Sequence, residues 1–320
     1  MTPALRVTGL RTEFDTRAGT VTAVNDVAFE VARGRILGLV GESGSGKSVT
    51  GFSILGLIDP PGRIAAGVVE VAGTDLRRLG PAALRRMRGK AVSMVFQDPM
   101  MTLNPVLRVG DQMARAVRAH DRVSRRAALD RAEAALRTVG IPAPRERLAA
   151  YPHQLSGGMR QRVAIAIALL HAPAVLIADE PTTALDVSIQ GQILAEVRRL
   201  ADDLGTAIVW ITHDLAVISS LADEICVMYA GRIVERGPAE RVIGAPVHPY
   251  TRGLLDSVPA GHPPGQPLPQ IPGSTPQLSS LPSGCPFRPR CPRATDICAT
   301  EPPLRGGAGH TVHCHHPLEG

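Results

Sequence analysis

GESGSGKS, residues Gly41 to Ser48, is the most informative segment of this 320-residue chain. It matches the pattern G-x-x-x-x-G-K-[ST] in full, follows the apolar run Ile36 to Val40 and opens an expected helix from Lys47 to Leu57. Glycines allow backbone N–H groups to surround a β-phosphate, and the helix N-terminus adds partial positive charge. Lys47 would contact the β- and γ-phosphates, and Ser48 would ligate magnesium. The segment therefore predicts a binding loop for a nucleoside triphosphate; a plain glycine-rich turn is the alternative.

The lysine of this loop stands out against the rest of the chain. Lys47 and Lys90 are the only lysines, whereas arginine occurs 33 times. Lysine carries a compact ammonium that arginine cannot imitate. Its retention at position 47 supports a role that needs a point charge.

Two adjacent acids follow a second apolar strand. The run Val175 to Ala178 ends in Asp179 and Glu180. Asp179 would hold magnesium, directly or through water, and Glu180 would polarise an attacking water as general base. A solvated junction between strand and loop is the alternative.

A third motif opens another helix. Ser156 is the expected N-cap in Leu155-Ser156-Gly157-Gly158-Met159, so this is a second helix start able to bind an anion. Because the first loop already accounts for one triphosphate, the second start serves either another ligand or a nucleotide held by another chain. A plain capped helix is the alternative.

Apolar strands and helices alternate along the first 255 residues. Strands are expected at Val21–Val31, Arg35–Val40, Ala91–Phe96, Ala174–Ala178 and Ala207–Thr212, and helices at Gly157–Leu170 and Ile189–Leu204. This alternation predicts an α/β core with a mostly parallel, buried sheet. The arginine-rich helical stretch Val109–Val139 interrupts it, so we expect a separate helical lobe over about residues 98–162.

Composition changes near residue 255. Half of the 28 prolines and four of the five cysteines lie beyond it. Such a segment is not expected to form a helical or sheet domain of the usual kind. We expect two parts, a domain over 1–255 and a proline-rich tail over 256–320 that is either a tethered coil or held together by a staple.

The overall composition excludes several classes of protein. An apolar content of 44% with 20% charged residues is typical of a globular chain. No apolar stretch is long enough to span a bilayer, no signal peptide is evident and the cysteines are few, so the cytosol is the expected compartment. The net charge of +6 invites a nucleic-acid partner, but aromatic residues make up only 3% of the chain, which leaves little for base stacking.

Taken in order, these motifs resemble those of the ATP-binding cassette (ABC) ATPases: the loop at 41–48, Gln97, the signature at 155–158, the acids at 179–180, Ala184-Leu185-Asp186 and His213. The resemblance implies a P-loop NTPase core of RecA-like type with an antiparallel β subdomain and an inserted helical lobe. It also implies two cassettes arranged head to tail, each ATP lying between one P-loop and the partner's signature. The second anion site would then act in trans.

The resemblance also implies roles for single residues. Glu180, His213 and Gln97 would be catalytic, and magnesium would be held by Ser48, Gln97 and Asp179. Phe14, the only aromatic residue in the first segment, would stack on adenine or else belong to the core. ATP-binding residues would be Phe14, Gly41, Glu42, Ser43, Gly44, Ser45, Gly46, Lys47, Ser48 and Thr50, and the partner's ATP would meet Leu155, Ser156, Gly157, Gly158 and Asp186.

Further segments are similar to the ATPase subunits of dipeptide and oligopeptide importers. They are Phe96 to Pro105, Tyr151-Pro152-His153-Gln154, His248-Pro249-Tyr250-Thr251 and the cysteine-bearing tail. This similarity implies an ATPase coupled to transmembrane transport, peripheral on the cytoplasmic face of the cell membrane. Its partners would be an identical or paralogous second cassette, two transmembrane permeases and, indirectly, a substrate-binding protein. An importer for nickel or glutathione is the alternative; a soluble nucleic-acid-linked ATPase or a metal sensor fits less well.

The tail cysteines form a separate candidate site. Cys285, Cys291, Cys298 and Cys314 are separated by five, six and fifteen residues, which is not the spacing of ordinary zinc ribbons. A proline-rich cytosolic tail without a core favours a metal staple. Resemblance to the importer tails favours a [4Fe-4S] cluster; zinc and free thiols are the alternatives. Because no recognised motif follows His213, ATP hydrolysis is expected to survive loss of these thiols.

Overall fold

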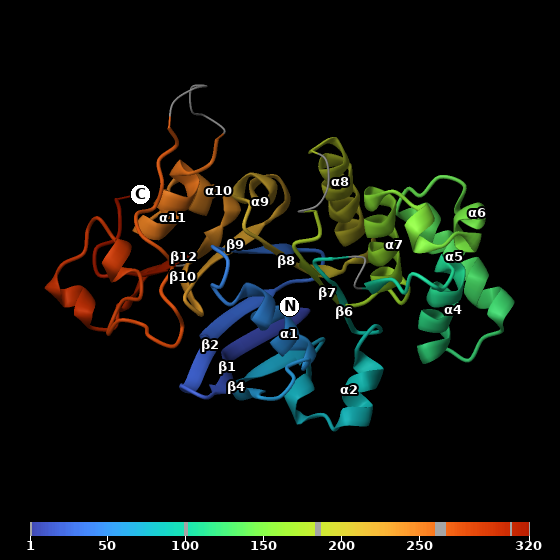
Figure 1. Cartoon of the computed structure of the whole chain (residues 1–320), viewed down its shortest axis with the longest axis horizontal. Helices are drawn as coiled ribbons and strands as arrows, with labels where there is room; N and C mark the ends of the chain where they lie inside the picture. The colour runs from blue at the N-terminus through green and yellow to red at the C-terminus, as the bar shows by residue number, and fades with distance from the viewer. Residues whose placement is uncertain (1, 99–101, 183–186, 260–266, 308, 320) are drawn as a thin grey trace. The chain divides into compact units, whose positions relative to one another are not determined.

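The structure is a computed structural model that describes residues 2–98, 102–182, 187–259, 267–307 and 309–319 (Figure 1). It divides into two compact units, each assembled from separated segments of the chain. The first contains Met1–Leu5, Val31–Arg35 and Glu70–Val209, and the second contains Arg6–Glu30, Ile36–Val69 and Trp210–Gly320. Among the described residues, no helix is both long and apolar enough to cross a membrane.

The first unit contains a buried parallel strand pair, β6 (Val92–Val95) and β7 (Val175–Asp179). Val92 lies opposite Val175, and Val95 lies opposite Ala178. All residues of both strands are buried, which explains their continuous apolar sequence. The long helix α8 (Val187–Leu204) follows β7, and β8 (Ala207–Thr212) begins in this unit and ends in the second.

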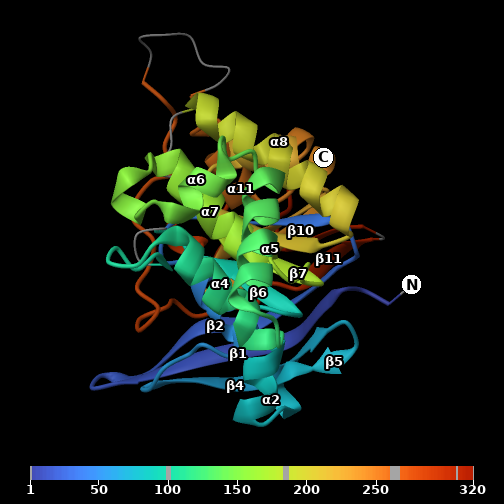
Figure 2. The ribbon, with the colours of Figure 1, turned by 90° about the vertical axis from the view of Figure 1, so that its right-hand side faces the viewer.

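Four further helices of this unit pack together: α4 (Val109–His120), α5 (Arg125–Thr138), α6 (Pro144–Ala149) and α7 (Gly157–Leu169), as Figure 2 shows. Ala128, Ala132 and Leu136 form the buried stripe of α5, where small side chains allow neighbouring helices to approach closely. The expected helical stretch over Val109–Val139 is therefore confirmed as two helices. They are separated at Ser124, whose hydroxyl accepts the N–H of Ala127.

The second unit holds the long neighbouring strands of a first sheet in the order β2 (Gly19–Val31), β1 (Leu5–Thr16) and β4 (Gly62–Val71). The two-residue connection between β1 and β2 makes that pair an antiparallel hairpin. In the first unit, the short β5 (Thr74–Asp75) pairs antiparallel with the end of β4, and α2 (Pro81–Met87) follows.

A second sheet in this unit runs in the order β11 (Leu304–Gly307), β12 (His310–His313), β10 (Arg232–Pro238), β9 (Glu224–Tyr229) and β3 (Ile36–Val40). β3 is parallel to β9, whereas the β9–β10, β10–β12 and β11–β12 pairs are antiparallel. The helices of the unit are α1 (Lys47–Leu55), α9 (Leu215–Leu221), α10 (Ala239–Gly244) and α11 (Pro249–Asp256). A Cβ on Gly38 would lie 2.3 Å from Ile218 Cγ1, so α9 rests closely on β3.

The tail differs from its sequence-based expectation. Its strand β12 extends the second sheet, with Val312 opposite Glu235 and Thr311 opposite Arg236. Phe287 and Val312 are buried, so the tail joins the apolar interior of the second unit. The prolines misled the sequence argument because the segment His310–His313 contains none, and its backbone N–H groups can therefore pair.

Candidate functional site

The loop Gly41–Ser48 connects β3 to α1, as its pattern predicts. Gly41 and Gly46 have φ angles of 151° and 100°, which disfavour any residue with a side chain. A Cβ on Gly46 would lie 2.5 Å from the carbonyl oxygen of Ala23, and one on Gly41 would lie 2.2 Å from that of Met228. The two glycines are thus required by close backbone contact as well as by conformation.

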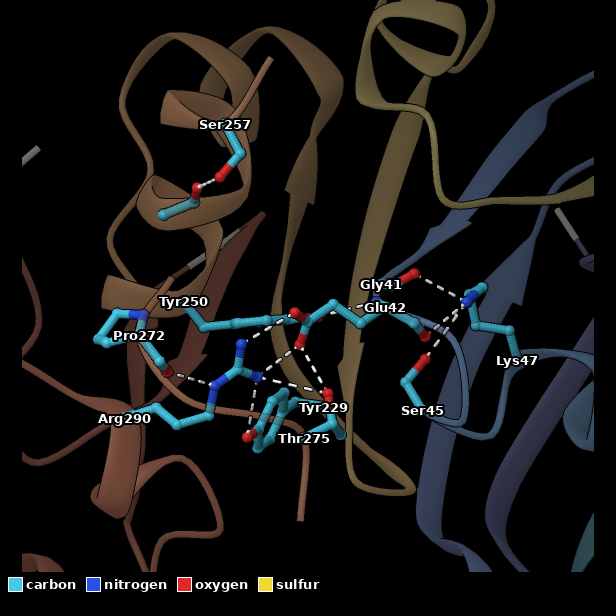
Figure 3. Close-up of polar contacts among 11 residues, drawn as sticks. Gly41, Glu42, Ser45, Lys47, Tyr229, Tyr250, Ser257, Pro272, Thr275 and Arg290 are labelled. Atoms are coloured by element: carbon cyan, nitrogen blue, oxygen red, sulfur yellow. Dashed lines mark hydrogen bonds and ion pairs between the residues drawn. The ribbon is translucent and has the colours of Figure 1, made fainter. Parts of the chain in front are cut away.

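Lys47 is folded back over this loop. Its buried ammonium lies 2.7 Å from the carbonyl oxygen of Gly41 and 2.9 Å from that of Glu42 (Figure 3). Ser48 is half-buried in the first turn of α1. The hydroxyl of Thr50 donates to the Gly46 carbonyl at 2.9 Å, so this expected ATP contact bonds to its own helix. The exposed Ser43 and Gly44 form the tip of the loop.

Glu42 is held by residues far along the chain. Arg290 Nη1 lies 2.6 Å from Glu42 Oε2, and the Thr275 hydroxyl donates to the same oxygen at 3.0 Å. The backbone N–H of Glu42 donates to the Tyr250 hydroxyl at 2.8 Å. Burial alone would raise the pKa of Glu42, but the hydrogen bonds from Arg290 and Thr275 outweigh it, and the pKa is lowered.

The acid pair lies at the end of β7. Asp179 is buried, whereas Glu180 is half-buried with φ of 44°, an uncommon value for a residue with a side chain. Gln97, just beyond β6, donates from Nε2 to Glu180 Oε2 at 3.3 Å. Parallel neighbouring strands end at the same edge, so β6 and β7 bring together residues 83 positions apart in the sequence. Strained backbone of this kind is typical of functional positions.

The remaining predicted residues occupy element ends. Ser156 is exposed and caps α7, where its hydroxyl accepts the N–H of Met159 at 3.3 Å. His213 is exposed directly after β8, and Asp214 caps α9. Phe14 is half-buried on β1 beside Gly62, whose Cβ would lie 2.6 Å from the ring. Asp186, with the preceding Ala184 and Leu185, lies outside the described residues.

The predicted magnesium ligands have suitable chemistry. Ser48, Gln97 and Asp179 would offer a hydroxyl, an amide oxygen and a carboxylate, which are the hard oxygen donors that magnesium prefers. Ser48 lies in the first turn of α1, Asp179 is the last residue of β7, and Gln97 follows β6. These donor types suit the ion, and their assignment as ligands stays a prediction.

The four tail cysteines lie close enough for electrostatic interaction. Burial and its three cysteine neighbours raise the pKa of the Cys314 thiol to about 11, and the N–H of Cys285 donates to the Cys298 carbonyl at 3.0 Å. Within the described ranges, however, no three His, Cys, Asp or Glu side chains are arranged to hold a metal. The predicted metal staple stays a prediction. Cys226 is buried in β9, and burial raises its pKa to about 12.

Comparison with known proteins supports the interpretation of these motifs. Residues 24–183 match the family model described as ABC transporter, and residues 234–298 match the one described as Oligopeptide/dipeptide transporter, C-terminal region. The chain belongs to the ABC transporter family. It shares 47% identity over 316 residues with the oligopeptide transport ATP-binding protein OppD of Escherichia coli (strain K12), covering 98% of this chain and 94% of that one.

A second relative and two solved structures agree. The dipeptide transport ATP-binding protein DppD of Bacillus subtilis (strain 168) is 46% identical and covers 98% of this chain, which in turn covers 95% of DppD. A dimeric ATP-binding cassette, MJ0796, bound to ADP and Pi, superposes with a TM-score of 0.66 at 25% identity, covering 73% of this chain and 98% of its own. The structure of cbiO1 from Clostridium perfringens superposes with a TM-score of 0.65 at 26% identity. The match covers 77% of this chain and 92% of cbiO1. The ABC ATPase fold is therefore established.

Three residues near the loop were missed by the sequence argument. Arg290, Thr275 and Tyr250 all contact Glu42, yet they lie more than 200 positions away from it. Tyr250 stands in a segment already recognised as similar to the importers, but no local pattern indicated its contact with Glu42. Only the packing of α11 and the tail shows the connection.

Proposed function

We propose that this chain is the ATP-hydrolysing subunit that powers import of di- and oligopeptides through a membrane ABC transporter. The observation that carries hydrolysis is the Gln97–Glu180 contact at the ends of β6 and β7, with Glu180 in a strained conformation. The observation that favours peptides is likeness over nearly the whole chain, tail included, to proteins named for peptide transport.

Each residue of the site has a role in this proposal. Lys47 and the loop N–H groups bind the β- and γ-phosphates of ATP, and Ser48, Asp179 and Gln97 would hold magnesium, which neutralises phosphate charge when bound. Glu180 accepts the proton of the attacking water through its carboxylate, while the Gln97 amide orients that carboxylate.

Three further residues complete the site in this proposal. His213 would donate a hydrogen bond to the γ-phosphate. Ser156, exposed at the start of α7, would bind the γ-phosphate held by a second cassette, so that hydrolysis needs a head-to-tail pair. The existence of a dimeric cassette of the same fold supports that pairing. Asp186 would serve the same interface.

The partners follow from the transport role. A second cassette, identical or paralogous, and two transmembrane permeases would complete the importer, with a substrate-binding protein delivering the solute. The chain would work at the cytoplasmic face of the membrane. Peptide selectivity would then belong to the permeases and the binding protein, not to this chain.

An uptake experiment tests the peptide assignment. A strain lacking this chain should lose uptake of labelled di- and oligopeptides, and the wild-type gene should restore it while Glu180→Gln should not. Affinity purification from native membranes should recover two permeases and a cassette. If the strain kept peptide uptake and lost uptake of nickel or glutathione, the chain would be assigned to an importer for that solute instead.

We also propose that Cys285, Cys291, Cys298 and Cys314 bind a metal, with a [4Fe-4S] cluster favoured over zinc. The influence of Cys291 and Cys298 on the pKa of Cys285, and of all three on the pKa of Cys314, supports this donor set. Protein purified without oxygen should absorb broadly in the visible range and contain about four irons per chain. Detection of zinc without iron would support a metal staple and exclude the iron–sulfur cluster. Absence of both metals would show that the four thiols are free.

A further inference from the structure

The phosphate-binding loop is tied to the C-terminal tail through its second residue. Glu42 meets the Arg290 guanidinium in a bidentate pair, with Nη1 to Oε2 at 2.6 Å and Nη2 to Oε1 at 3.0 Å (Figure 3). Its backbone N–H is held independently by the Tyr250 hydroxyl. Both the side chain and the backbone of one loop residue are therefore held from beyond residue 249.

Arg290 itself has little freedom. Its side chain is 5% exposed, and its Nε donates to the Pro272 carbonyl at 2.9 Å. The guanidinium carbon lies 5.9 Å from the Tyr229 ring centre and 6.0 Å from that of Phe287. A planar guanidinium fixed in this way can bind the Glu42 carboxylate in only one orientation. A buried charge also costs free energy once its partner is removed.

Glu42 also contacts Lys47, so restraint of Glu42 affects the position of the Lys47 ammonium. Its carbonyl oxygen accepts a hydrogen bond from Lys47 Nζ at 2.9 Å, and the Gly41 carbonyl oxygen accepts another from the same ammonium at 2.7 Å. A shift of Glu42 therefore displaces the neighbouring backbone N–H groups and a carbonyl that orients the ammonium. Those are the groups that bind phosphates in the function proposed above.

We propose that Arg290 is a positioning residue for the phosphate-binding loop, so that the C-terminal tail sets the affinity of this chain for ATP. The inference rests on the proposed ATP-binding function of the loop. Arg290 touches no substrate; it acts through Glu42. Disturbance of the tail should therefore weaken nucleotide binding without removing any catalytic group.

The test compares ATP binding in matched variants. Glu42→Gln keeps the shape of the loop residue and removes its charge, Arg290→Met removes the guanidinium from the tail, and Arg293→Met changes an exposed arginine of the same tail as a control. Binding of a non-hydrolysable ATP analogue with magnesium is measured by calorimetry on the full chain. Both Glu42→Gln and Arg290→Met should weaken binding by about fivefold or more, and the control should match wild type.

Further readouts separate positioning from a structural effect. The variant that carries both Glu42→Gln and Arg290→Met should bind the ATP analogue no more weakly than the single variant with the lower affinity. The reason is that both substitutions remove the same contact. KM for ATP should rise while kcat at saturating ATP stays within about twofold of wild type. By thermodynamic reciprocity, ATP should protect the segment around Arg290 from hydrogen exchange in wild type and lose this effect in Glu42→Gln.

Three outcomes would overturn the role. Wild-type affinity in both single variants would show that the contact does not position the loop. Weak binding in Arg290→Met alone, with a lowered melting temperature and a normal Glu42→Gln, would show a structural contribution of the tail. A wild-type chain that bound no ATP would refute the proposed function and this role with it.

Discussion

Glu180 shows how a single residue can be prepared for chemistry by its backbone. It follows a buried strand, adopts φ of 44° and accepts a hydrogen bond from Gln97. Its carboxylate meets the amide of Gln97, a residue that follows the neighbouring strand β6. An ordinary extended conformation would continue the strand, so the strain is tied to the position of the carboxylate.

We expect Glu180→Gln to lower ATP turnover by about 100-fold or more and to leave ATP binding intact, because only the proton acceptor is lost. Steady-state phosphate release and equilibrium binding of ATP measure the two effects. Asp203→Asn, on the exposed end of α8, is a matched control that should hydrolyse ATP normally. Turnover within about threefold of wild type would exclude Glu180 as the base.

Helix starts carry much of the function at the scale of elements. α1 begins in the phosphate-binding loop, α7 begins at the exposed Ser156, and α11 begins at the buried His248. The three starts use different groups: glycine backbone, a serine hydroxyl and an imidazole nitrogen. A side chain caps α7 and α11, whereas Gly46 gives α1 no side-chain cap. Ser156 and the loop tip before α1 are exposed, and His248 is buried.

At the start of α7, Ser156→Arg should leave ATP binding to an isolated chain unchanged and should block hydrolysis that depends on dimers. The bulky cation would occupy the position that the partner's γ-phosphate needs. Binding is measured on dilute monomer, and hydrolysis is measured over a range of protein concentration. Weaker ATP binding by the monomer would place Ser156 at its own nucleotide instead of the partner's.

At the start of α11, His248 should make stability depend on pH. Its Nδ1 accepts the N–H of Tyr250, its Nε2 has no partner among the described residues, and burial lowers its pKa to about 3. The unfolded chain takes up a proton below the ordinary value of 6.5, whereas the native chain does not until about 3. The contribution of His248 to the free energy of unfolding is therefore complete above pH 6.5 and decreases as the pH falls toward 3.

A change from pH 7 to pH 5 should lower the free energy of unfolding by about 2 kcal/mol through His248. Urea unfolding of the wild type at both values measures the loss. His248→Asn keeps a side-chain acceptor for the helix start and should flatten the difference. An equally steep pH dependence in that variant would assign the effect to other groups.

The tail and the nucleotide loop form one cooperative region of the second unit. The rings of Phe287, Tyr229 and Tyr250 pack together, with centres 5.3 Å apart for Phe287 and Tyr229, 4.6 Å for Tyr229 and Tyr250, and 5.4 Å for Tyr250 and Phe287. Arg290 contacts Glu42 beside them. The expectation that ATP hydrolysis survives loss of the tail thiols stays a prediction, and these contacts add the expectation that ATP affinity changes. Arg290 immediately precedes Cys291, so changes at the thiols should reach the loop.

We expect Cys291→Ser to lose any bound metal, to expose the chain beyond residue 255 to protease and to weaken ATP binding by about fivefold, with kcat retained. Elemental analysis, limited proteolysis and calorimetry measure the three effects. Arg293→Met should change none of them. Normal ATP affinity in a variant whose tail is demonstrably cleaved would separate the tail from the loop.

Local patterns in the sequence determined the core elements and most of the candidate site. The strands β3, β6, β7 and β8 and the helices α1 and α7 lie within about two residues of their predicted bounds, because buried strands and helix starts carry short-range signals. The loop glycines, Lys47 and the acid pair were identified for the same reason. Their chemistry depends on neighbours in the chain.

Only the tertiary structure decided where the tail packs. The pairing of β12 with β10 and the contact of Arg290 with Glu42 join residues separated by 75 or more positions. No local spacing predicts such contacts, because they depend on which faces are left to be buried once the sheet has formed. A proline-rich segment could therefore be recognised from composition, but its burial against the phosphate-binding loop could not.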